Sequence, residues 1–448
     1  MSTPSSTIVV LVPGTTGSTL VTGLQPYSSS IPVWPASVLG PIEGSSPPSS
    51  LAEMAAEALL KETLYPGVLL GTGSFAPGTT TALSSATTGY APFINYFLEM
   101  GSFTYYPAQW SGPSGSPSSG WGLPSSLSSN LLVAFPYDWR QDCATSAQQL
   151  QGFLGTIASL YESTPYQLYL VAHSMGGLVC RAYLETGLAS ANGQPQVQAL
   201  ITLGTPHLGA PEALAGIMGT LPGFTGEIDT TEVIFTPQAI DTLAVNFVDS
   251  RYSDSTFELL PPNVAVSPSS VTQFITDNGQ SYSIFDAPGE VTKTIQTSIL
   301  ANGLPGFVNT YTNNLNAASS FFGTLDYTGA RTATPYYCVY GTNAPPLTPG
   351  SPSGTCVGYN YASGTLTQVR APDGDDVVPA LSAQFVSRTV AGVYEASGVN
   401  HFGLPTDPGV QAQVASWMGL SSPVSGSGGS SVRLPGVVVA AEITAGAD

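Results

Sequence analysis

Six short apolar runs lie along this chain of 448 residues, and each is rich in β-branched or aromatic side chains. They lack the polar–apolar alternation of half-exposed strands, so the pattern predicts strands that are buried on both faces, as in a parallel sheet. The runs are residues 8–12, 131–135, 167–171, 199–203, 336–340 and 389–394.

Helical patterns lie between these predicted strands. Apolar positions 150, 153, 154, 157 and 160 would share one face of a helix, and a second helix is expected directly after Ser174. Strands that alternate with helices predict an α/β fold with a mostly parallel, doubly wound sheet and right-handed crossovers.

Two intervals are too long to be ordinary connections, about 21–130 and 208–335. We expect them to form a cap or lid over the strand ends, where open α/β sheets bind ligands. Residues 1–420 would then form one domain with two insertions. Residues 421–431 are mostly Ser and Gly and predict a flexible linker, and the tail at 432–448 is either disordered or an edge strand.

The charge balance limits the partners. Lys and Arg total 9 against 28 Asp and Glu, and the net charge of −19 repels phosphate backbones, so nucleic acid is not an expected partner. No apolar stretch approaches the roughly 18 residues of a membrane span. The start of the chain has no signal-peptide pattern, and the hydroxyl-rich composition favours an exported mature form over a cytosolic protein.

Cysteines and histidines are few, four and three respectively. Neither type has the paired spacing of a zinc site, so the sequence predicts no metal and no cofactor. Cys338 and Cys356 flank a loop rich in Gly, Pro and Ser, and a disulfide between them is one interpretation. Cys143 and Cys180 carry no such signal.

Ser174 lies in a pattern typical of a catalytic serine. Residues 168–177 read LYLVAHSMGG, which predicts a strand, a tight turn of small residues and a helix. In such a nucleophile elbow the serine hydroxyl stands clear of the sheet, and the residues two before and two after it must be small. Ala172 and Gly176 meet this requirement. A chance match in a chain rich in Ser and Gly is disfavoured by the apolar strand before the turn.

A serine hydroxyl needs a base at neutral pH, and only three histidines can supply one. His173 adjoins the serine and must point away from its hydroxyl. His207 follows the very next predicted strand, whereas the order in α/β-hydrolases is serine, acid, histidine. His401 follows the last predicted strand and is therefore the predicted base.

The acid must precede His401, and residues 373–379 read DGDDVVP. A carboxylate there would orient the imidazole and stabilise the imidazolium. Asp375 is preferred, because an acid followed by one variable residue and a short apolar run is the usual arrangement, and Asp376 is the alternative acid. For the oxyanion hole we expect backbone N–H donors from Met175 and from the loop 12–17, where Thr15 is the favoured donor.

Beyond the elbow, the chain resembles the lecithin:cholesterol acyltransferase family, which includes lysosomal phospholipase A2 and bacterial lipase-like relatives. The similar segments follow in family order. They are LVPG at 11–14, PYDWR at 136–140, AHSMGG at 172–177, GTPHLG at 204–209, LLP at 259–261, YGT at 340–342 and GDDVVP at 374–379. The resemblance implies an α/β-hydrolase with a cap and a lid, which moves an acyl group from a phospholipid or other lipid-like ester to water or an alcohol. It also implies a Ser174, Asp375 and His401 triad.

The chain departs from the family pattern in places. Residues 21–120 lack the closely spaced cysteine pair of the animal enzymes, so their lipoprotein and membrane docking is not carried over. Isolated aromatics such as Trp34, Trp110 and Trp121 are more often core residues, but contact with a lipid interface is a second interpretation. Asp138 and Arg140 fit equally a buried ion pair or a substrate role.

Two other functions stay open at this point. A secreted esterase or polyester depolymerase would suit the hydroxyl-rich surface and flexible tail. A non-catalytic lipid-binding protein on a hydrolase scaffold is the other, since fold alone does not establish function. The complete set of serine, histidine, acid and oxyanion loop argues against the second.

Overall fold

A computed structural model gives the fold of the chain and describes residues 6–21, 32–34, 65–69, 72, 76–87, 89–107, 123–218, 254–301, 305–347 and 352–421. Trp110, Trp121, the predicted tail at 432–448 and nearly all of the predicted linker lie outside these described residues, and of Trp34 only the backbone is described.

A seven-stranded sheet forms the centre of the molecule, in the order β14-β11-β8-β7-β1-β6-β5, and every pairing in it is parallel. The strands are β1 (Ser6–Val12), β5 (Phe103–Pro107), β6 (Asn130–Ala134), β7 (Tyr166–His173), β8 (Val197–Leu203), β11 (Tyr336–Thr342) and β14 (Gly392–Ser397). Six of them contain or overlap the six predicted runs, which confirms six strands there, but the predicted burial on both faces is wrong for the last run, 389–394. Unlike the others, β14 is largely exposed on alternate positions, because it lies at an edge and pairs only with β11.

The sheet extends into the first predicted insertion. Strand β5 pairs with β6, and the helix before it, α2 (Ala91–Glu99), buries Phe93, Ile94 and Phe97 in the core. This part of the interval 21–130 therefore belongs to the central layer rather than to a lid. No continuous apolar run marks this strand in the sequence, because β5 is half-buried on alternate positions, as edge strands are.

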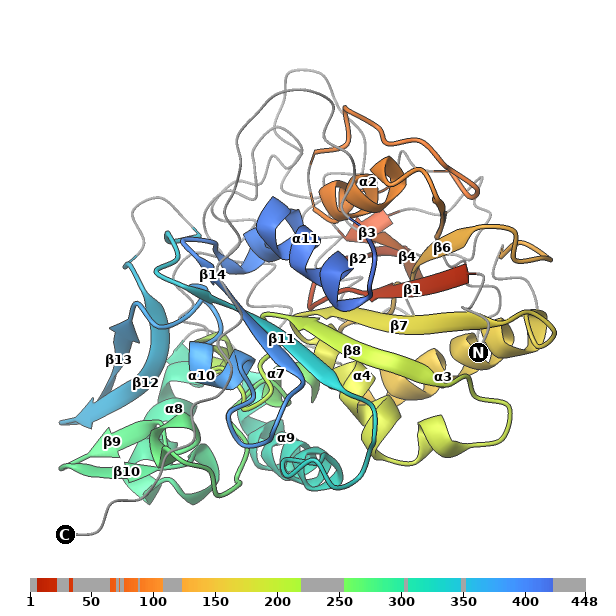
Figure 1. Cartoon of the computed structure of the whole chain (residues 1–448). Coiled ribbons are helices and arrows are strands. Elements are labelled where there is room, and N and C mark those ends of the chain that lie inside the picture. Colours follow the sequence, from red (N-terminus) through yellow and green to blue (C-terminus); the bar gives the residue numbers. More distant parts are fainter. Residues whose placement is uncertain are drawn as a thin grey trace, which may run out of the picture.

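Helices cover both faces of the sheet (Figure 1). Helices α3 (Cys143–Leu160) and α4 (Gly176–Glu185) lie on one face, and α2 and α11 (Pro408–Trp417) lie on the other. Side chains of β1 alternate between the two resulting cores: Ile8 and Val10 pack with α3 and α4, whereas Val9 and Leu11 pack with α2 and α11. Each fully buried aliphatic side chain of this kind contributes roughly 1.5–3 kcal/mol to stability.

Helix α3 follows the predicted helical pattern. Its apolar stripe is buried at four of the five positions, and the last, Leu160, is 42% exposed at the end of the helix. Asp142 caps its first turn by accepting a hydrogen bond from the Thr145 backbone N–H at 2.7 Å.

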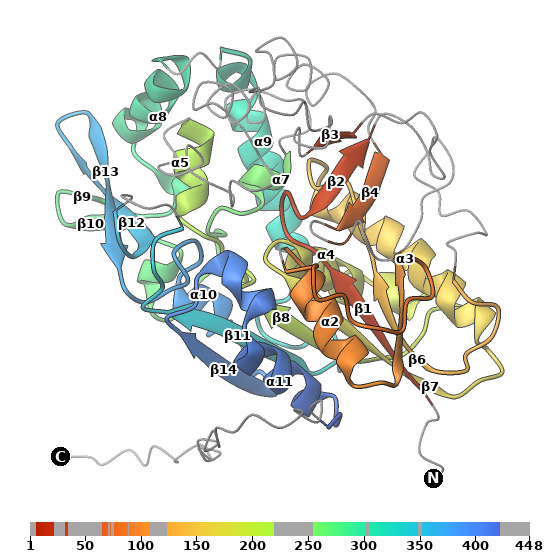
Figure 2. The ribbon, with the colours of Figure 1, turned by 90° about the horizontal axis from the view of Figure 1, so that it is seen from above.

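Further elements gather at one end of the molecule (Figure 2). They comprise α5 (Glu212–Met218), α7 (Asp254–Phe257), α8 (Gly289–Ala301) and α9 (Pro305–Thr324), with a second sheet of β10 (Gln280–Tyr282), β9 (Ile275–Asp277), β12 (Thr355–Ala362) and β13 (Thr365–Ala371). Most come from the second predicted insertion, and their role as a cap stays a prediction. The hairpin β12–β13 lies outside that insertion and was not predicted. A third, small sheet joins β3 (Pro32–Trp34), β2 (Ser18–Val21) and β4 (Tyr65–Leu69).

All four cysteines are free and buried, so the predicted disulfide is wrong. Cys338 lies in the central sheet and Cys356 in the second sheet, where its thiol contacts the Gly358 carbonyl oxygen at 3.5 Å. Burial raises the pKa of Cys338 to about 11 and that of Cys356 to about 12, which keeps both thiols protonated at neutral pH.

Among the described residues, no helix combines the length and the apolar character needed to cross a membrane.

Candidate active site

Ser174 occupies the turn between β7 and α4. Its φ of 53° is unusual for a residue with a side chain, and a hydrogen bond from its backbone N–H to the Leu203 carbonyl oxygen at 2.9 Å helps hold the turn. The small neighbours are required by space: a Cβ on Gly176 would collide with the carbonyl oxygens of Pro13 and Val12. The segment therefore has the geometry of a nucleophile elbow.

Three side chains form a continuous hydrogen-bonded chain at the ends of the central strands. The Ser174 Oγ lies 2.8 Å from His401 Nε2, and His401 Nδ1 lies 2.7 Å from Asp375 Oδ2. His401 and Asp375 are 3% and 0% exposed, so water does not compete for the bond between them. An ionised Asp375 accepts from Nδ1–H, which leaves Nε2 free to accept the serine proton.

The two candidate acids have different partners. Asp375 Oδ1 accepts the backbone N–H of Val377 at 3.1 Å and of Val378 at 2.7 Å, so its other oxygen is held toward His401. Asp376 turns away, and its Oδ2 accepts the backbone N–H of Leu347 at 2.7 Å. The structure thus brings Asp375, and not Asp376, to the imidazole.

A hairpin is inserted between the central strand β11 and the segment that carries Asp375. Strand β11 ends at Thr342, and the hairpin β12–β13 intervenes before the chain returns beside it, where the Asn343 backbone N–H donates to the Pro372 carbonyl oxygen at 2.7 Å. Gly341 in β11 allows this return, because a Cβ there would lie 2.6 Å from that of Asp375.

The predicted oxyanion donors flank the serine. The Thr15 hydroxyl donates to the Met175 sulfur at 3.3 Å, which links the loop after β1 to the start of α4. A Cβ on Gly14 would lie 2.6 Å from the Ser174 Cβ, so this loop lies directly against the nucleophile. Among the described residues, neither the Thr15 nor the Met175 backbone N–H has a protein acceptor. Both are thus available to a developing oxyanion.

Comparisons with known proteins agree with this architecture. Residues 127–287 match the family model of lecithin:cholesterol acyltransferase (LCAT). A stretch of 73 residues is 33% identical to the lysosomal thioesterase PPT2 of Rattus norvegicus and, equally, of Mus musculus, and it covers 16% of this chain and 22% of each relative. The crystal structure of the Tle4-Tli4 complex superposes with a TM-score of 0.52 over 91% of this chain and 97% of that chain, at 15% identity, which is a similarity of fold. The chain has an α/β-hydrolase fold, and its residues 127–287 are similar to the LCAT family.

The LCAT-like PYDWR segment braces the loop that carries Thr15. The Tyr137 hydroxyl donates to the Pro13 carbonyl oxygen at 2.9 Å, and Trp139 Nε1 donates to the Ser18 carbonyl oxygen at 3.1 Å. Arg140 and Asp138 form a bidentate ion pair at 2.7 and 2.8 Å, and both are almost fully buried. Of the two roles left open by the sequence, these contacts fit the bracing role.

The other two histidines of the chain are away from the serine hydroxyl. His207 stacks on Phe385 at 4.4 Å between ring centres and bonds to Thr202 Oγ1 at 3.0 Å. His173 instead contacts the backbone of His401 and the hydroxyl of Tyr90. Tyr90 was missed by the sequence reasoning, and no local pattern marks it, because its partners are distant in the chain.

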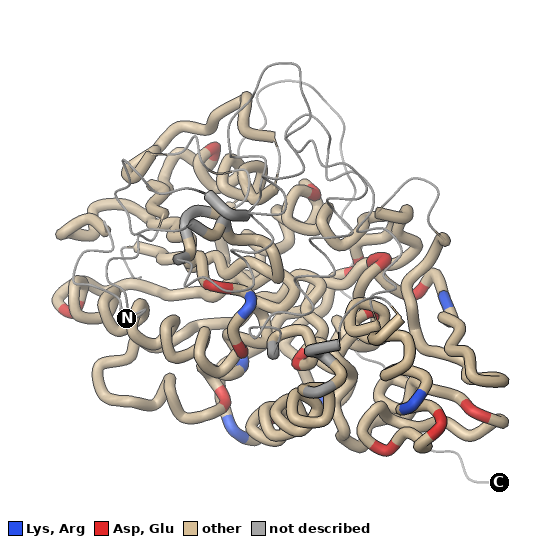
Figure 3. Tube along the Cα trace, turned by 180° about the vertical axis from the view of Figure 1, so that it is seen from behind, with Lys and Arg blue, Asp and Glu red and all other residues tan. Residues whose placement is uncertain are grey.

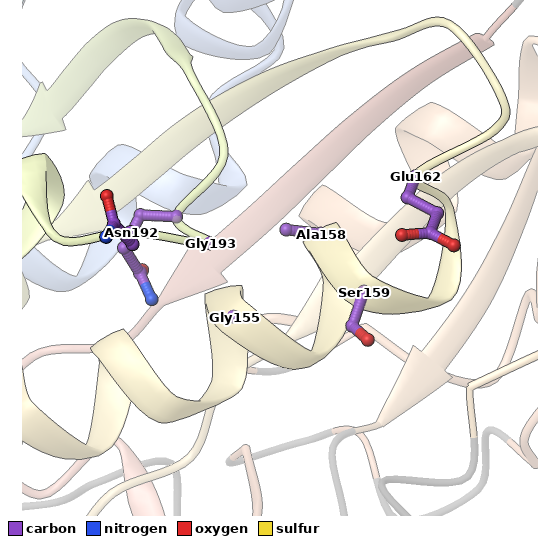
Figure 4. Close-up of a pocket in the computed structure, with 7 residues that line it drawn as sticks. Gly155, Ala158, Ser159, Glu162, Asn192 and Gly193 are labelled. Atoms are coloured by element: carbon purple, nitrogen blue, oxygen red, sulfur yellow. The ribbon is translucent and has the colours of Figure 1, made fainter.

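A surface hollow elsewhere on the molecule is distinct from this site (Figure 4). It lies between α3 and the residues after η2 (Leu188–Ser190), and none of the triad residues lines it. Its lining residues are Gly155, Ala158, Ser159, Glu162, Asn192, Gly193 and Gln194. In the part of the chain that the structure describes, no three His, Cys, Asp or Glu side chains converge as metal ligands would.

Proposed function

We propose that this LCAT-like hydrolase is a serine carboxylic-ester hydrolase that acts on lipid-like esters, as a lipase or phospholipase does, through an acyl-enzyme on Ser174. The observation that carries the proposal is the 2.8 Å contact between Ser174 Oγ and His401 Nε2, in series with the 2.7 Å contact to Asp375. The thioesterase activity named for the rat and mouse relatives is a further possibility for the same acyl chemistry.

The mechanism has two steps. Ser174 Oγ attacks the ester carbonyl carbon while its proton moves to His401 Nε2, and the backbone N–H groups of Thr15 and Met175 stabilise the oxyanion. Collapse of the tetrahedral intermediate expels the alcohol, which takes the proton back from His401. Water or a second alcohol then attacks the acyl-enzyme with His401 again as base, and regenerates Ser174. Hydrolysis and O-acyl transfer differ only in this acceptor.

The charge distribution supports an uncharged ester as substrate. The whole chain has nine Lys and Arg, and Figure 3 shows how sparsely they occur along the described trace. Four of them, Arg140, Arg181, Arg370 and Arg388, form ion pairs with carboxylates of the protein itself. Phe402, directly after the base, is 52% exposed and offers an apolar surface beside the site. Contact with a lipid interface is therefore part of the proposal.

Replacing the nucleophile tests the function. Wild type, Ser174→Ala and the exposed control Ser159→Ala are compared with p-nitrophenyl esters of increasing chain length, phospholipid and polyester films, and each is treated with a fluorophosphonate probe. We expect hydrolysis and labelling in wild type and Ser159→Ala and neither in Ser174→Ala. Lipid products formed with and without an added alcohol distinguish hydrolysis from transfer. Undiminished turnover by Ser174→Ala would refute the proposal, and an unlabelled, inactive wild type would favour a non-catalytic lipid-binding protein.

A further inference from the structure

Four separate elements meet at the side chains of Tyr90 and His173. Gly14 belongs to the loop after β1, Tyr90 precedes α2, His173 ends β7 and His401 begins η5 (His401–Thr406). The Gly14 backbone N–H donates to the Tyr90 hydroxyl oxygen at 3.0 Å. The same hydroxyl lies 2.8 Å from His173 Nδ1, and His173 Nε2 lies 3.0 Å from the His401 carbonyl oxygen.

The chemistry of the groups fixes the direction of every bond in this chain. The carbonyl oxygen of His401 can only accept, so His173 must carry its proton on Nε2. Its Nδ1 is then an acceptor and takes the Tyr90 O–H, whose oxygen accepts from Gly14. Each donor and each acceptor is used once, and for a neutral His173 no other arrangement of protons satisfies all three contacts.

The hydrogen bonds through Tyr90 and His173 lie in the protein interior, and this burial keeps His173 neutral. Tyr90 and His173 are 5% and 4% exposed. Burial lowers the pKa of His173 well below its usual value, and the neighbouring His401 lowers it further, with ring centres 4.8 Å apart. Burial also raises the pKa of Tyr90, so its hydroxyl keeps its proton. The bond directions are therefore maintained at neutral pH.

This series of hydrogen bonds ends at Gly14 on one side and at the His401 carbonyl group on the other. These two groups belong to the segments that must approach Ser174 from opposite sides. Gly14 directly precedes Thr15, the favoured oxyanion donor, and lies against Ser174. At the other end, the carbonyl group held by His173 belongs to the residue whose imidazole accepts the serine proton. The loop after β1 packs closely against Tyr90, because a Cβ on Gly17 would lie 2.8 Å from the Tyr90 hydroxyl.

We propose that Tyr90 and His173 are positioning residues, which hold the loop of Thr15 and the backbone of His401 at a fixed separation around Ser174. The inference rests on the proposed function. Neither side chain touches the reacting atoms, and each acts through the groups it holds. Loss of either should misplace both the oxyanion donor and the base, so the effect falls on the transition state more than on substrate binding.

The test compares Tyr90→Phe, His173→Gln and the double variant with wild type. Tyr90→Phe leaves the Gly14 N–H and His173 Nδ1 unpartnered, and we expect kcat to fall about ten- to hundredfold with KM changed less than about threefold. His173→Gln keeps an amide donor for the His401 carbonyl and should lose less. The matched control is Tyr96→Phe in α2, the helix that Tyr90 precedes, since the Tyr96 hydroxyl has no hydrogen-bond partner among the described residues. That variant should match wild type.

All rates are divided by the number of active sites titrated with a fluorophosphonate, so that a variant that folds poorly is not counted as slow. Affinity for a boronic acid, which forms a tetrahedral adduct on serine, should fall by the same factor as kcat/KM. The fold-loss in kcat of the double variant should be smaller than the product of the two single fold-losses, because both substitutions break the same series of hydrogen bonds. A titrated kcat for Tyr90→Phe equal to that of Tyr96→Phe, or fully multiplicative losses, would overturn the proposal. Absence of Ser174-dependent activity in wild type would instead refute the proposed function.

Discussion

The loop after β1 allows a sharp test of how closely the nucleophile is confined. Gly14 has its Cα so near the elbow that an added methyl group would lie 2.6 Å from Ser174 Cβ, 3.2 Å from Ser174 Oγ and 3.3 Å from the His173 carbonyl oxygen. Non-bonded carbon atoms are comfortable at about 3.5–4.0 Å. In Gly14→Ala the loop and the serine must therefore separate by about 1 Å.

A displacement of this size has a predictable cost. Because Thr15 follows Gly14, its backbone N–H moves away from the oxyanion position, and misplacement by about 1 Å lowers rates by roughly 10²-fold. At about 1.36 kcal/mol per factor of ten, this corresponds to about 2.7 kcal/mol of lost transition-state stabilisation. Overpacking should also lower the free energy of unfolding by about 1–3 kcal/mol.

The assay is kcat/KM for a soluble ester, per active site titrated, with denaturant unfolding measured in parallel. The control is Gly323→Ala in α9, where an added Cβ meets nothing within 4 Å. Activity of Gly323→Ala should equal wild type, and its stability should rise by about 0.5–1 kcal/mol, since Ala is the better helix former. A kcat/KM for Gly14→Ala within about twofold of wild type would show that the loop does not confine the serine, and the reasoning would fail.

Three further predictions follow from contacts and charge. Asp375→Asn should lower kcat roughly 10⁴-fold, whereas Asp376→Asn, which keeps an oxygen for the Leu347 N–H, should stay within about tenfold of wild type; the reverse order would reassign the acid. Burial acts to raise the pKa of Asp326, but hydrogen bonds from Arg331, Thr328 and Gly329 lower it to about 2, from a usual value of 3.8. Asp326 therefore contributes about 2 kcal/mol to the free energy of unfolding above pH 4, and this contribution is lost as the pH falls through about 2. In acid unfolding measurements, Asp326→Asn should not show this pH-dependent loss of stability. Because the net charge is −19, raising the salt from about 10 to about 150 mM should increase the rate on anionic vesicles and leave that on zwitterionic vesicles unchanged, as measured by fatty-acid release.

Local patterns predicted the elements that are buried on both faces. The runs in β1, β6, β7, β8 and β11 are continuous and apolar because helices cover the sheet on both sides. Half-exposed strands lack that signal, so β5 and the β12–β13 hairpin were missed, and the predicted run 389–394 overlaps the half-exposed β14 only at 392–394. The disulfide prediction was wrong because the loop between Cys338 and Cys356 connects two different sheets, so the two thiols are not brought together.

The convergence of Ser174, His401 and Asp375 could be predicted because each of them lies in a short segment of recognisable order. The elbow is a local pattern, and the scarcity of histidine narrowed the base to one residue. Tyr90 could not be found in this way, since its contact with His173 spans 83 positions and arises only when α2 packs into the hydrophobic core that it shares with β7. His173 was correctly expected to point away from the serine hydroxyl, but its partners depend on the same tertiary packing.

The order in which the sheet is assembled has a consequence for the cell that makes this chain. His401 follows Ser174 by 227 positions and arrives with β14, an edge strand that pairs only with β11. At translation speeds of about 5–20 residues per second, a ribosome exposes the elbow on the order of 10 to 50 seconds before the imidazole emerges. During that interval the nascent polypeptide carries Ser174 without the His401 imidazole, so the proposed hydrolase stays inactive in the cell until β14 has been synthesised.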